Sequence, residues 1–210
     1  MNSNQYRLFY VHDPMCSWCW GFQKTWQQVH SNLTNSIDIQ YIVGGLAPDS
    51  DQPMPEAQQQ AIAGYWRTIQ TKIPGTEFNF DFWSQCSPRR STYPACRAVL
   101  AAKTIEREKE TDMIAAIQHA YYLQAQNPSN IDTLIACAEK IGLKKTVFEH
   151  TLKSDEIETL FQEQLQLATD LGARGFPSLI LTTPQANQSI LIDYNNPSFI
   201  TQQVMANISA

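Results

Sequence analysis

Hydrophobic and polar positions follow two different periods along this chain. Near the N-terminus, apolar runs over residues 6–12 and 37–43 flank a stretch in which Phe22, Trp26, Val29 and Leu33 recur at spacings of four, three and four. Apolar runs of strand length around a helical stripe predict a strand, a helix and a second strand. A unit of this length implies parallel strands joined by a right-handed crossover.

Beyond a loop-like segment containing Pro53 and Pro55, the pattern is helical for about a hundred residues. It predicts helices near residues 56–72, 93–107, 112–123, 131–141 and 144–152. Asn130 is the predicted N-cap of the fourth of these helices and Gly142 its C-terminal stop. The change of period marks residues 46–154 as a predicted all-helical insertion.

The C-terminal stretch returns to a mixed pattern. Ser154 is predicted to cap a long helix with an acidic first turn, which Gly172 ends. Runs at 178–182 and 189–193 predict two paired strands, and a last helix begins near Pro197. The element order predicts an α/β fold in which residues 1–45 and 155–210 form one discontinuous domain around the helical insertion, residues 46–154.

Composition narrows the possible partners and the compartment. The 210 residues carry a formal net charge of -5 without a basic cluster, which argues against nucleic acid as a partner. The N-terminal apolar run is too short for a signal-peptide core and no run is long enough to span a membrane, so we expect a cytoplasmic protein without membrane contact. Its five irregularly spaced cysteines do not resemble a secreted disulfide framework.

The closest cysteine pair, Cys16 and Cys19, lies between the first predicted strand and the helix. Cysteines at positions i and i+3 share a helix face, where their sulfurs can bond. At the helix start Cys16 lies at the positive end of the helix dipole, which favours its thiolate, the attacking species. Cys19, one turn further along, is expected to be more buried. The pair therefore predicts disulfide exchange in which Cys16 attacks and Cys19 resolves.

Two other interpretations of the pair remain open at this point: half of a zinc site, or two ordinary core cysteines. A zinc site needs further ligands, and Cys86 and Cys96 are ten residues apart without a nearby partner. His12 ends the first strand, where a capping or solvent-facing role is open. Asp13 could be a turn residue or a proton acceptor near Cys19, and the turn is favoured.

A second motif, Gly175–Ser178 with sequence GFPS, precedes the third predicted strand. Proline donates no ladder hydrogen bond, so Pro177 fits the start of a strand. A cis bond before Pro177 would turn the backbone of Phe176 toward the cysteine pair, where it can pair with an extended substrate. A trans proline that only starts the strand is the alternative.

The CSWC site, the helical insertion and the GFP loop together resemble the thioredoxin superfamily, and within it the DsbA-like oxidoreductases. Segments 10–15 and 89–97 resemble a branch of cytoplasmic protein disulfide isomerases. The resemblance implies a thioredoxin-like fold and a thiol:disulfide oxidoreductase or isomerase, with Cys16 as nucleophile, Cys19 as resolving thiol and Pro177 as a cis-proline. The Ser-Trp pair between the cysteines departs from Pro-His and Gly-Pro in well-known members, so the direction of electron flow is not implied.

The same resemblance suggests the surroundings of the site and its partners. Substrates would be proteins or peptides bearing thiols or disulfides, with a thiol reductant or glutathione as co-substrate and with no metal or other cofactor. Trp18 and Trp20 could form an apolar docking surface, although core packing of one ring is equally open. The residues expected to contact substrate are Phe176, Trp18, Trp20, Met15 and His12.

Three alternative functions remain open beside this prediction. Kappa-class glutathione transferases and chromene-carboxylate isomerases share the architecture but use serine without a CxxC pair. A metal-binding module would use both thiolates and His12, and a noncatalytic interaction protein would not need Cys16. Among weaker signals, Cys86 and Cys96 could form a second pair or pack in the core, Cys137 is expected in the core, and three arginines could attract a carboxylate or face solvent: Arg89, Arg90 and Arg97.

Overall fold

The computed structural model describes residues 6–208, in which one sheet has the strand order β2-β1-β3-β4. β1 (Arg7–His12) and β2 (Asp38–Val43) are parallel and joined by α1 (Ser17–Leu33). β3 (Ser178–Thr182) is antiparallel to β1, and β4 (Asn187–Ile190) is antiparallel to β3. β4 begins two residues earlier than predicted because Thr183 accepts and donates hydrogen bonds across a tight turn to Ala186.

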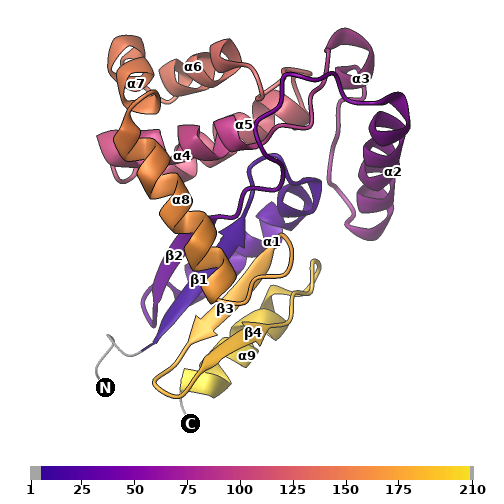
Figure 1. Cartoon of the computed structure of the whole chain (residues 1–210). Coiled ribbons are helices and arrows are strands. Elements are labelled where there is room, and N and C mark those ends of the chain that lie inside the picture. Colours follow the sequence, from indigo (N-terminus) through magenta and orange to yellow (C-terminus); the bar gives the residue numbers. More distant parts are fainter. Residues whose placement is uncertain (1–5, 209–210) are drawn as a thin grey trace.

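The sheet is the middle of three layers (Figure 1). Successive side chains of a strand face opposite sides, so Leu8 and Tyr10 point to one face while Phe9 and Val11 point to the other. The first face packs against α1 and α9 (Pro197–Ile208), and the second packs against α8 (Asp155–Asp170). Because both faces of β1 are covered, its continuous apolar run is explained by burial on two sides.

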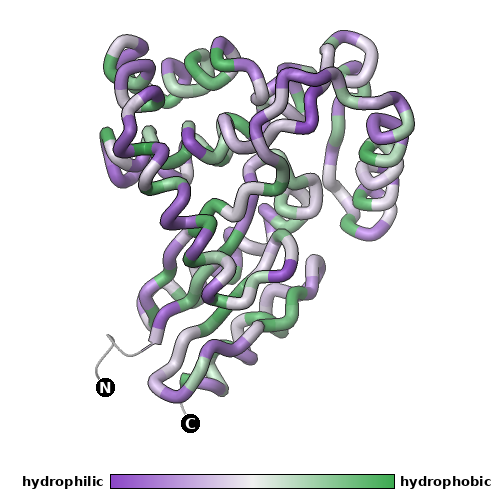
Figure 2. Tube along the Cα trace, in the orientation of Figure 1, coloured by the Kyte–Doolittle hydropathy of each residue, from purple (hydrophilic) through white to green (hydrophobic). Residues whose placement is uncertain are grey.

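The remaining helices gather at one end of the sheet, beside the end of β1 that leads into the cysteine pair (Figure 1). They are α2 (Glu56–Lys72), α3 (Phe82–Gln85), α4 (Tyr93–Ile105), α5 (Lys109–Tyr122), α6 (Ile131–Lys140) and α7 (Lys145–Leu152). α3, a single turn, was not predicted. In Figure 2 the central strands are mostly hydrophobic, whereas hydrophobic and hydrophilic residues alternate along the helices. The predicted α/β fold with a helical insertion is confirmed.

The largest apolar cluster crosses from the helices into the sheet region. It combines most of the buried residues of α4–α7 with Met15, Trp20 and Val43. Division of the chain at residues 45 and 154 into two folding units stays a prediction, and its outer limits at residues 1 and 210 lie outside the described residues. Within the described range, no helix combines the length and apolar character needed to cross a membrane.

Helix ends follow the predicted signals with one exception. The Ser154 hydroxyl accepts a hydrogen bond from the Ile157 N–H and caps α8. Gly142 and Gly172 end their helices with positive φ angles of 90° and 82°, which glycine adopts without strain. Asn130 occupies the N-cap position of α6, but its side chain does not cap the helix. The Asn130 oxygen instead accepts a hydrogen bond from Arg89, so the predicted N-cap position is confirmed but the side-chain cap bond is absent.

Candidate active site

A tight turn connects β1 to the first cysteine. The Asp13 carbonyl accepts a hydrogen bond from the Cys16 N–H at 3.0 Å, and Asp13 Oδ1 accepts one from the Met15 N–H at 2.7 Å. Cys16 then takes the N-cap position of α1 with an extended backbone and without a side-chain cap bond. Its sulfur therefore lies beside the unpaired N–H groups of the first helical turn, at the positive end of the dipole.

Asp13 also ties this turn to two distant segments. Its Oδ2 accepts hydrogen bonds from the Leu46 N–H at 2.7 Å and the Thr92 hydroxyl at 2.6 Å, and lies 3.5 Å from Cys96 Sγ. Burial raises the pKa of the fully buried Asp13 carboxyl, and these donors oppose the rise. The favoured turn role agrees with the structure, but the link to α4 has no signal in the local pattern because its partners are 79 and 83 residues away.

The two thiols of the pair, both free in this structure, differ in their surroundings. Cys16 keeps 6% of its surface exposed, and its thiol donates to the Phe176 carbonyl at 3.4 Å. Cys19 is fully buried, as predicted. Burial raises the pKa of the Cys19 thiol well above its usual value, and the neighbouring Cys16 sulfur and the Asp13 charge raise it further. Cys16 is thus the more exposed sulfur of the pair, and Cys19 is the more buried one.

The GFP loop lies directly against Cys16. The peptide bond between Phe176 and Pro177 is cis, and both side chains are half-buried. The Phe176 ring packs on Gly44, at the end of β2, so closely that an added Cβ there would lie 1.9 Å from a ring carbon. Gly44 is therefore required to let the ring, and with it the carbonyl beside Cys16, take this position.

A cleft of about 840 Å3 opens beside Trp18 and Phe176. Apolar side chains from α2 and the C-terminal segment form much of its wall, and Lys72 and Asp193 add charge. The Trp18 ring lies 5.4 Å from the Tyr194 ring, which fixes one side of the opening. Trp18 and Phe176 are thus the two expected contact residues that line a cavity next to Cys16.

Three other expected contact residues are buried instead. Trp20 stacks on Tyr122 of α5 with ring centroids 5.5 Å apart, and its Nε1 donates to the Glu77 carbonyl at 2.9 Å. Met15 keeps 7% exposure and packs in the same apolar cluster as Trp20. His12 is fully buried. His12 has no exposed surface through which to contact a substrate, whereas substrate contact by Met15 and Trp20 stays a prediction.

His12 also differs from its predicted role as a capping or solvent-facing residue. Its ring stacks on Tyr10 at 5.1 Å, and neither ring nitrogen has a hydrogen-bond partner among the described residues. Burial, with a smaller effect from the Lys103 charge, lowers the pKa of His12 to about 3. The ring is neutral at physiological pH and acts as part of the core.

Comparison with known proteins agrees with this arrangement. A family model described as thioredoxin matches residues 9–200. The chain belongs to the thioredoxin family. A structure described as a candidate protein disulfide isomerase from Nitrosomonas europaea is 26% identical, with a TM-score of 0.83 and 97% of each chain covered. The DsbA oxidoreductase from Xylella fastidiosa, 15% identical with a TM-score of 0.60 over 98% of this thioredoxin-family protein and 88% of its own chain, shares the fold.

Two further matches are less similar in sequence than the Nitrosomonas structure: a solved structure that has the same fold, and a relative that is longer than this chain. The cytosolic disulfide reductase DsbM from Pseudomonas aeruginosa is 22% identical, with a TM-score of 0.77 over 97% of this chain and 98% of its own; a second DsbM structure contains GSH. The ClpXP adapter protein SpxH of Halalkalibacterium halodurans is 22% identical over 92% of this chain. The thioredoxin-family protein covers 64% of that relative's length.

The other cysteines of this thioredoxin-family protein have separate partners. Cys86 donates to the Ala125 carbonyl at 3.0 Å, whereas Cys96 is fully buried against Asp13. Cys137 packs in the core, as expected, and burial raises the pKa of its thiol to about 11. Across residues 6–208, no three His, Cys, Asp or Glu side chains are grouped as a metal site requires.

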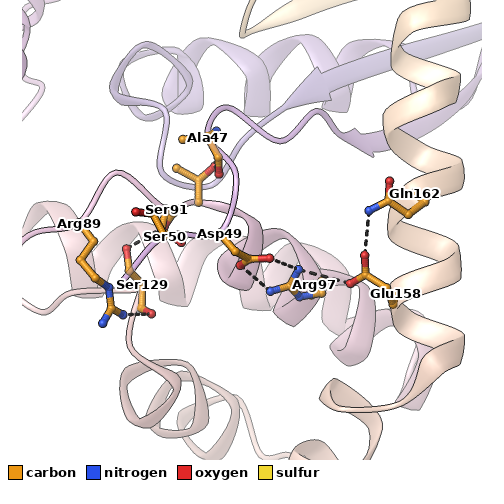
Figure 3. Close-up of polar contacts among 10 residues, drawn as sticks. Ala47, Asp49, Ser50, Arg89, Ser91, Arg97, Ser129, Glu158 and Gln162 are labelled. Carbon is orange, nitrogen blue, oxygen red and sulfur yellow. Dashed lines mark hydrogen bonds and ion pairs between the residues drawn. The ribbon is translucent and has the colours of Figure 1, made fainter. Parts of the chain in front are cut away.

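Two of the three arginines, Arg89 and Arg97, lie in a polar region beside α4 and α6 (Figure 3), and the role of Arg90 stays a prediction. Arg97 pairs with Asp49 at 2.7 Å and with Glu158 at 3.3 Å, so its charge is neutralised within the protein. Arg89 donates to the Ser129 carbonyl and to Asn130. These contacts give Arg89 and Arg97 structural partners, and neither residue lines the cleft beside Cys16.

Proposed function

We propose that this chain is a thiol:disulfide oxidoreductase that uses Cys16 as its nucleophile and Cys19 as its resolving thiol. The observation that carries the proposal is the asymmetry of the pair: Cys16 lies at a helix N-terminus and contacts the Phe176 carbonyl beside the cleft, while Cys19 is fully buried behind it. A nucleophile must reach its substrate, whereas a resolving thiol needs to reach only the nucleophile.

In the reducing direction, the Cys16 thiolate attacks a substrate disulfide and releases one substrate sulfur as a thiolate. The Cys19 thiolate then attacks Cys16 Sγ, which breaks the mixed disulfide, releases the second substrate thiol and leaves a Cys16–Cys19 disulfide. The two electrons pass from the cysteine pair to the substrate. Oxidation of a substrate dithiol follows the same steps in reverse.

The cleft supports a peptide or glutathione as substrate. An extended segment lying along the 176–178 loop would place its sulfur beside Cys16, with Trp18 and Phe176 against its apolar groups. Glutathione as co-substrate is supported by the DsbM structure that contains GSH. A reducing cytoplasmic compartment suits a protein in which the other three cysteines also stay free.

The decisive experiment compares three cysteine variants in the reduction of a peptide disulfide and of oxidised glutathione. Cys16→Ser is expected to abolish exchange, because the attacking sulfur is removed. Cys19→Ser is expected to retain attack and to accumulate a stable mixed disulfide, detected as a mass increase on Cys16. Cys86→Ser, a half-buried thiol with its own partner, serves as the control and is expected to keep full activity.

Full exchange activity in Cys16→Ser would contradict the proposal. Absence of exchange in the parent protein would favour a noncatalytic role, such as the adapter function for which the relative SpxH is named. The direction of electron flow follows from the reduction potential of the pair in graded glutathione buffers. A potential near about -270 mV would assign a reductase, and a value of about -120 to -180 mV an oxidase or isomerase.

A further inference from the structure

The helical insertion contributes one wall of the cleft beside Cys16. Lys72 and Ile73, at the C-terminal end of α2, line this cleft of about 840 Å3 together with Trp18 of α1 and the segment after β4. A cleft of this volume holds a small ligand or a few residues of a peptide. The side chains at the end of α2 therefore contribute to the choice of substrate at the cysteine pair.

The backbone at Lys72 is fixed to both neighbouring elements. Asn195, in the segment after β4, donates a hydrogen bond from Nδ2 to the Lys72 carbonyl at 3.1 Å. Ile73 is buried and packs so closely on α1 that a Cβ added at Gly21 would lie 2.8 Å from Ile73 Cδ1. The lysine side chain thus starts from a defined position on the cleft wall.

Lys72 and Asp193 are the charged residues that line the cleft, and they differ in their internal partners. Asp193 Oδ1 accepts hydrogen bonds from the Asn195 N–H at 2.9 Å and from the Asn196 N–H at 3.1 Å. Within residues 6–208, by contrast, the ion pairs involve other cations, and none includes the Lys72 ammonium. The cleft therefore presents a positive charge that no described carboxylate neutralises.

We propose that Lys72 is a specificity-determining residue that binds a carboxylate of the substrate. The preferred substrates are then disulfides of peptides that carry an acidic side chain or a C-terminal carboxylate within two residues of the cysteine. This inference rests on the proposed function. The Lys72 ammonium offers three donors, which a carboxylate can accept, and most of the other lining side chains are apolar and cannot pair with a charged group.

The charge of the whole chain does not supply this preference. Its formal net charge is -5, so the long-range field of the protein repels an acidic peptide. Attraction must therefore come from contact with Lys72, which is exposed. An exposed ion pair changes an affinity by about twofold to fivefold. Because the lysine touches the substrate away from the reacting sulfurs, we expect this effect in substrate binding and not in the limiting rate of exchange.

The test uses disulfide-linked dimers of a blocked tripeptide, Gly-Cys-X-amide, in which X is Asp, Asn or Lys, and a second set with X before the cysteine. Reduced full-length protein is mixed with each dimer, and the reaction is quenched with acid and analysed by mass. The dependence on peptide concentration gives an apparent dissociation constant and a limiting rate. Each rate is divided by the rate of the same dimer with dithiothreitol, which corrects for the intrinsic reactivity of the disulfide.

Three variants change the charge at one position: Lys72→Gln removes it, Lys72→Arg conserves it and Lys72→Glu reverses it. Lys24→Gln is the matched control, because Lys24 is also an exposed lysine close to α2 but donates to the Gly75 carbonyl at 2.8 Å and does not line the cleft. The control should retain the substrate preference of the parent protein.

In at least one peptide set the parent protein is expected to bind the Asp dimer about twofold to fivefold more tightly than the Asn dimer, and the Lys dimer least tightly. Lys72→Arg should keep this order, Lys72→Gln should lose it with an unchanged limiting rate, and Lys72→Glu should reverse it. Salt at about 1 M should remove the preference of the parent, because it screens charges beyond about 3 Å.

The inference is overturned if the parent protein does not distinguish the Asp and Asn dimers in either set, or if Lys72→Gln keeps the preference. It is also overturned if Lys72→Gln slows all dimers equally, which would indicate a structural role of the lysine. A parent protein that reduces none of the dimers and forms no Cys16–Cys19 disulfide would instead refute the proposed function.

Discussion

Cys16 and Cys19 carry the same functional group in different environments. The dipole of α1 acts on Cys16, whereas Cys19 has no exposed surface and lies near the negative charge of Asp13. In the proposed exchange Cys16 attacks the substrate and Cys19 resolves, because a fully buried thiol needs to reach only Cys16. The order of the two steps is thus determined by burial and by position along one helical turn.

His12 makes the folding stability of the protein dependent on pH. Burial holds its pKa near 3, below its value of about 6.5 in the unfolded chain. The unfolded state therefore binds the proton first, and the resulting stability is present above pH ~6.5 and is lost as the pH falls toward 3. From about pH 7 to about pH 5 this group should remove about 2 kcal/mol from the free energy of unfolding.

His12→Phe should abolish that part of the pH dependence without a large loss of stability at neutral pH, since neither ring nitrogen has a partner to lose. Urea unfolding of both proteins across this pH range measures the difference. His150→Gln, which replaces an exposed histidine, is the control and should behave as the parent protein. Parallel pH profiles for the parent and His12→Phe would contradict the assigned neutral state of His12.

Gly44 allows the close packing that holds the Phe176 carbonyl beside Cys16. Gly44→Ala would place a methyl group inside the Phe176 ring, so the ring and its loop must move. We expect peptide-disulfide exchange to slow about tenfold or more, because a small misplacement near reacting atoms has effects of this size. Gly64→Ala, a helical glycine with nothing within 4 Å of the added Cβ, is the matched control. Equal exchange rates in the two variants would show that the Phe176 position is irrelevant to activity.

At the scale of elements, the cap of α8 is predicted to stabilise the whole helix. Ser154→Ala removes the hydroxyl that accepts from the Ile157 N–H, and the loss should be about 1 kcal/mol in the free energy of unfolding. Ser154→Asp should restore most of it, because an aspartate can accept the same bond and adds negative charge at the helix start. Denaturant titration measures the three free energies of unfolding. A Ser154→Ala variant as stable as the parent protein, or more stable than Ser154→Asp, would contradict the prediction.

The elements that could be predicted from the sequence are those with local signals. The apolar period and the cap at Ser154 located α8, and the paired cysteines with the GFP loop located the candidate site. The sequence did not predict contacts between residues that are far apart along the chain. Nothing near Asp13 indicates that it accepts a hydrogen bond from Thr92, 79 residues away. Burial of His12 and Trp20 depends on helices from the insertion, which a single strand or helix pattern does not contain.

For the whole molecule, the placement of Trp20 predicts how the two regions unfold. Trp20 belongs to α1 but stacks on Tyr122 of α5 and donates to the Glu77 carbonyl, and it lies in the cluster formed mainly by the insertion. Asp13 adds hydrogen bonds to Leu46 and Thr92 across the same boundary. Because apolar packing and buried hydrogen bonds both cross the boundary, we expect the sheet region and the helices to unfold in one cooperative transition.

Trp20→Ala should lower the stability of both regions together, by about 3–5 kcal/mol, because it leaves a large cavity at their boundary. Hydrogen exchange followed by mass spectrometry during urea titration checks this for β1 and for α4 separately. Trp18→Ala, two residues earlier on the same helix, removes a half-buried ring in the cleft and should weaken substrate exchange with little effect on unfolding. Exposure of α4 at a lower urea concentration than β1 would instead mean that the insertion is an independent folding unit, attached to the active site without stabilising it.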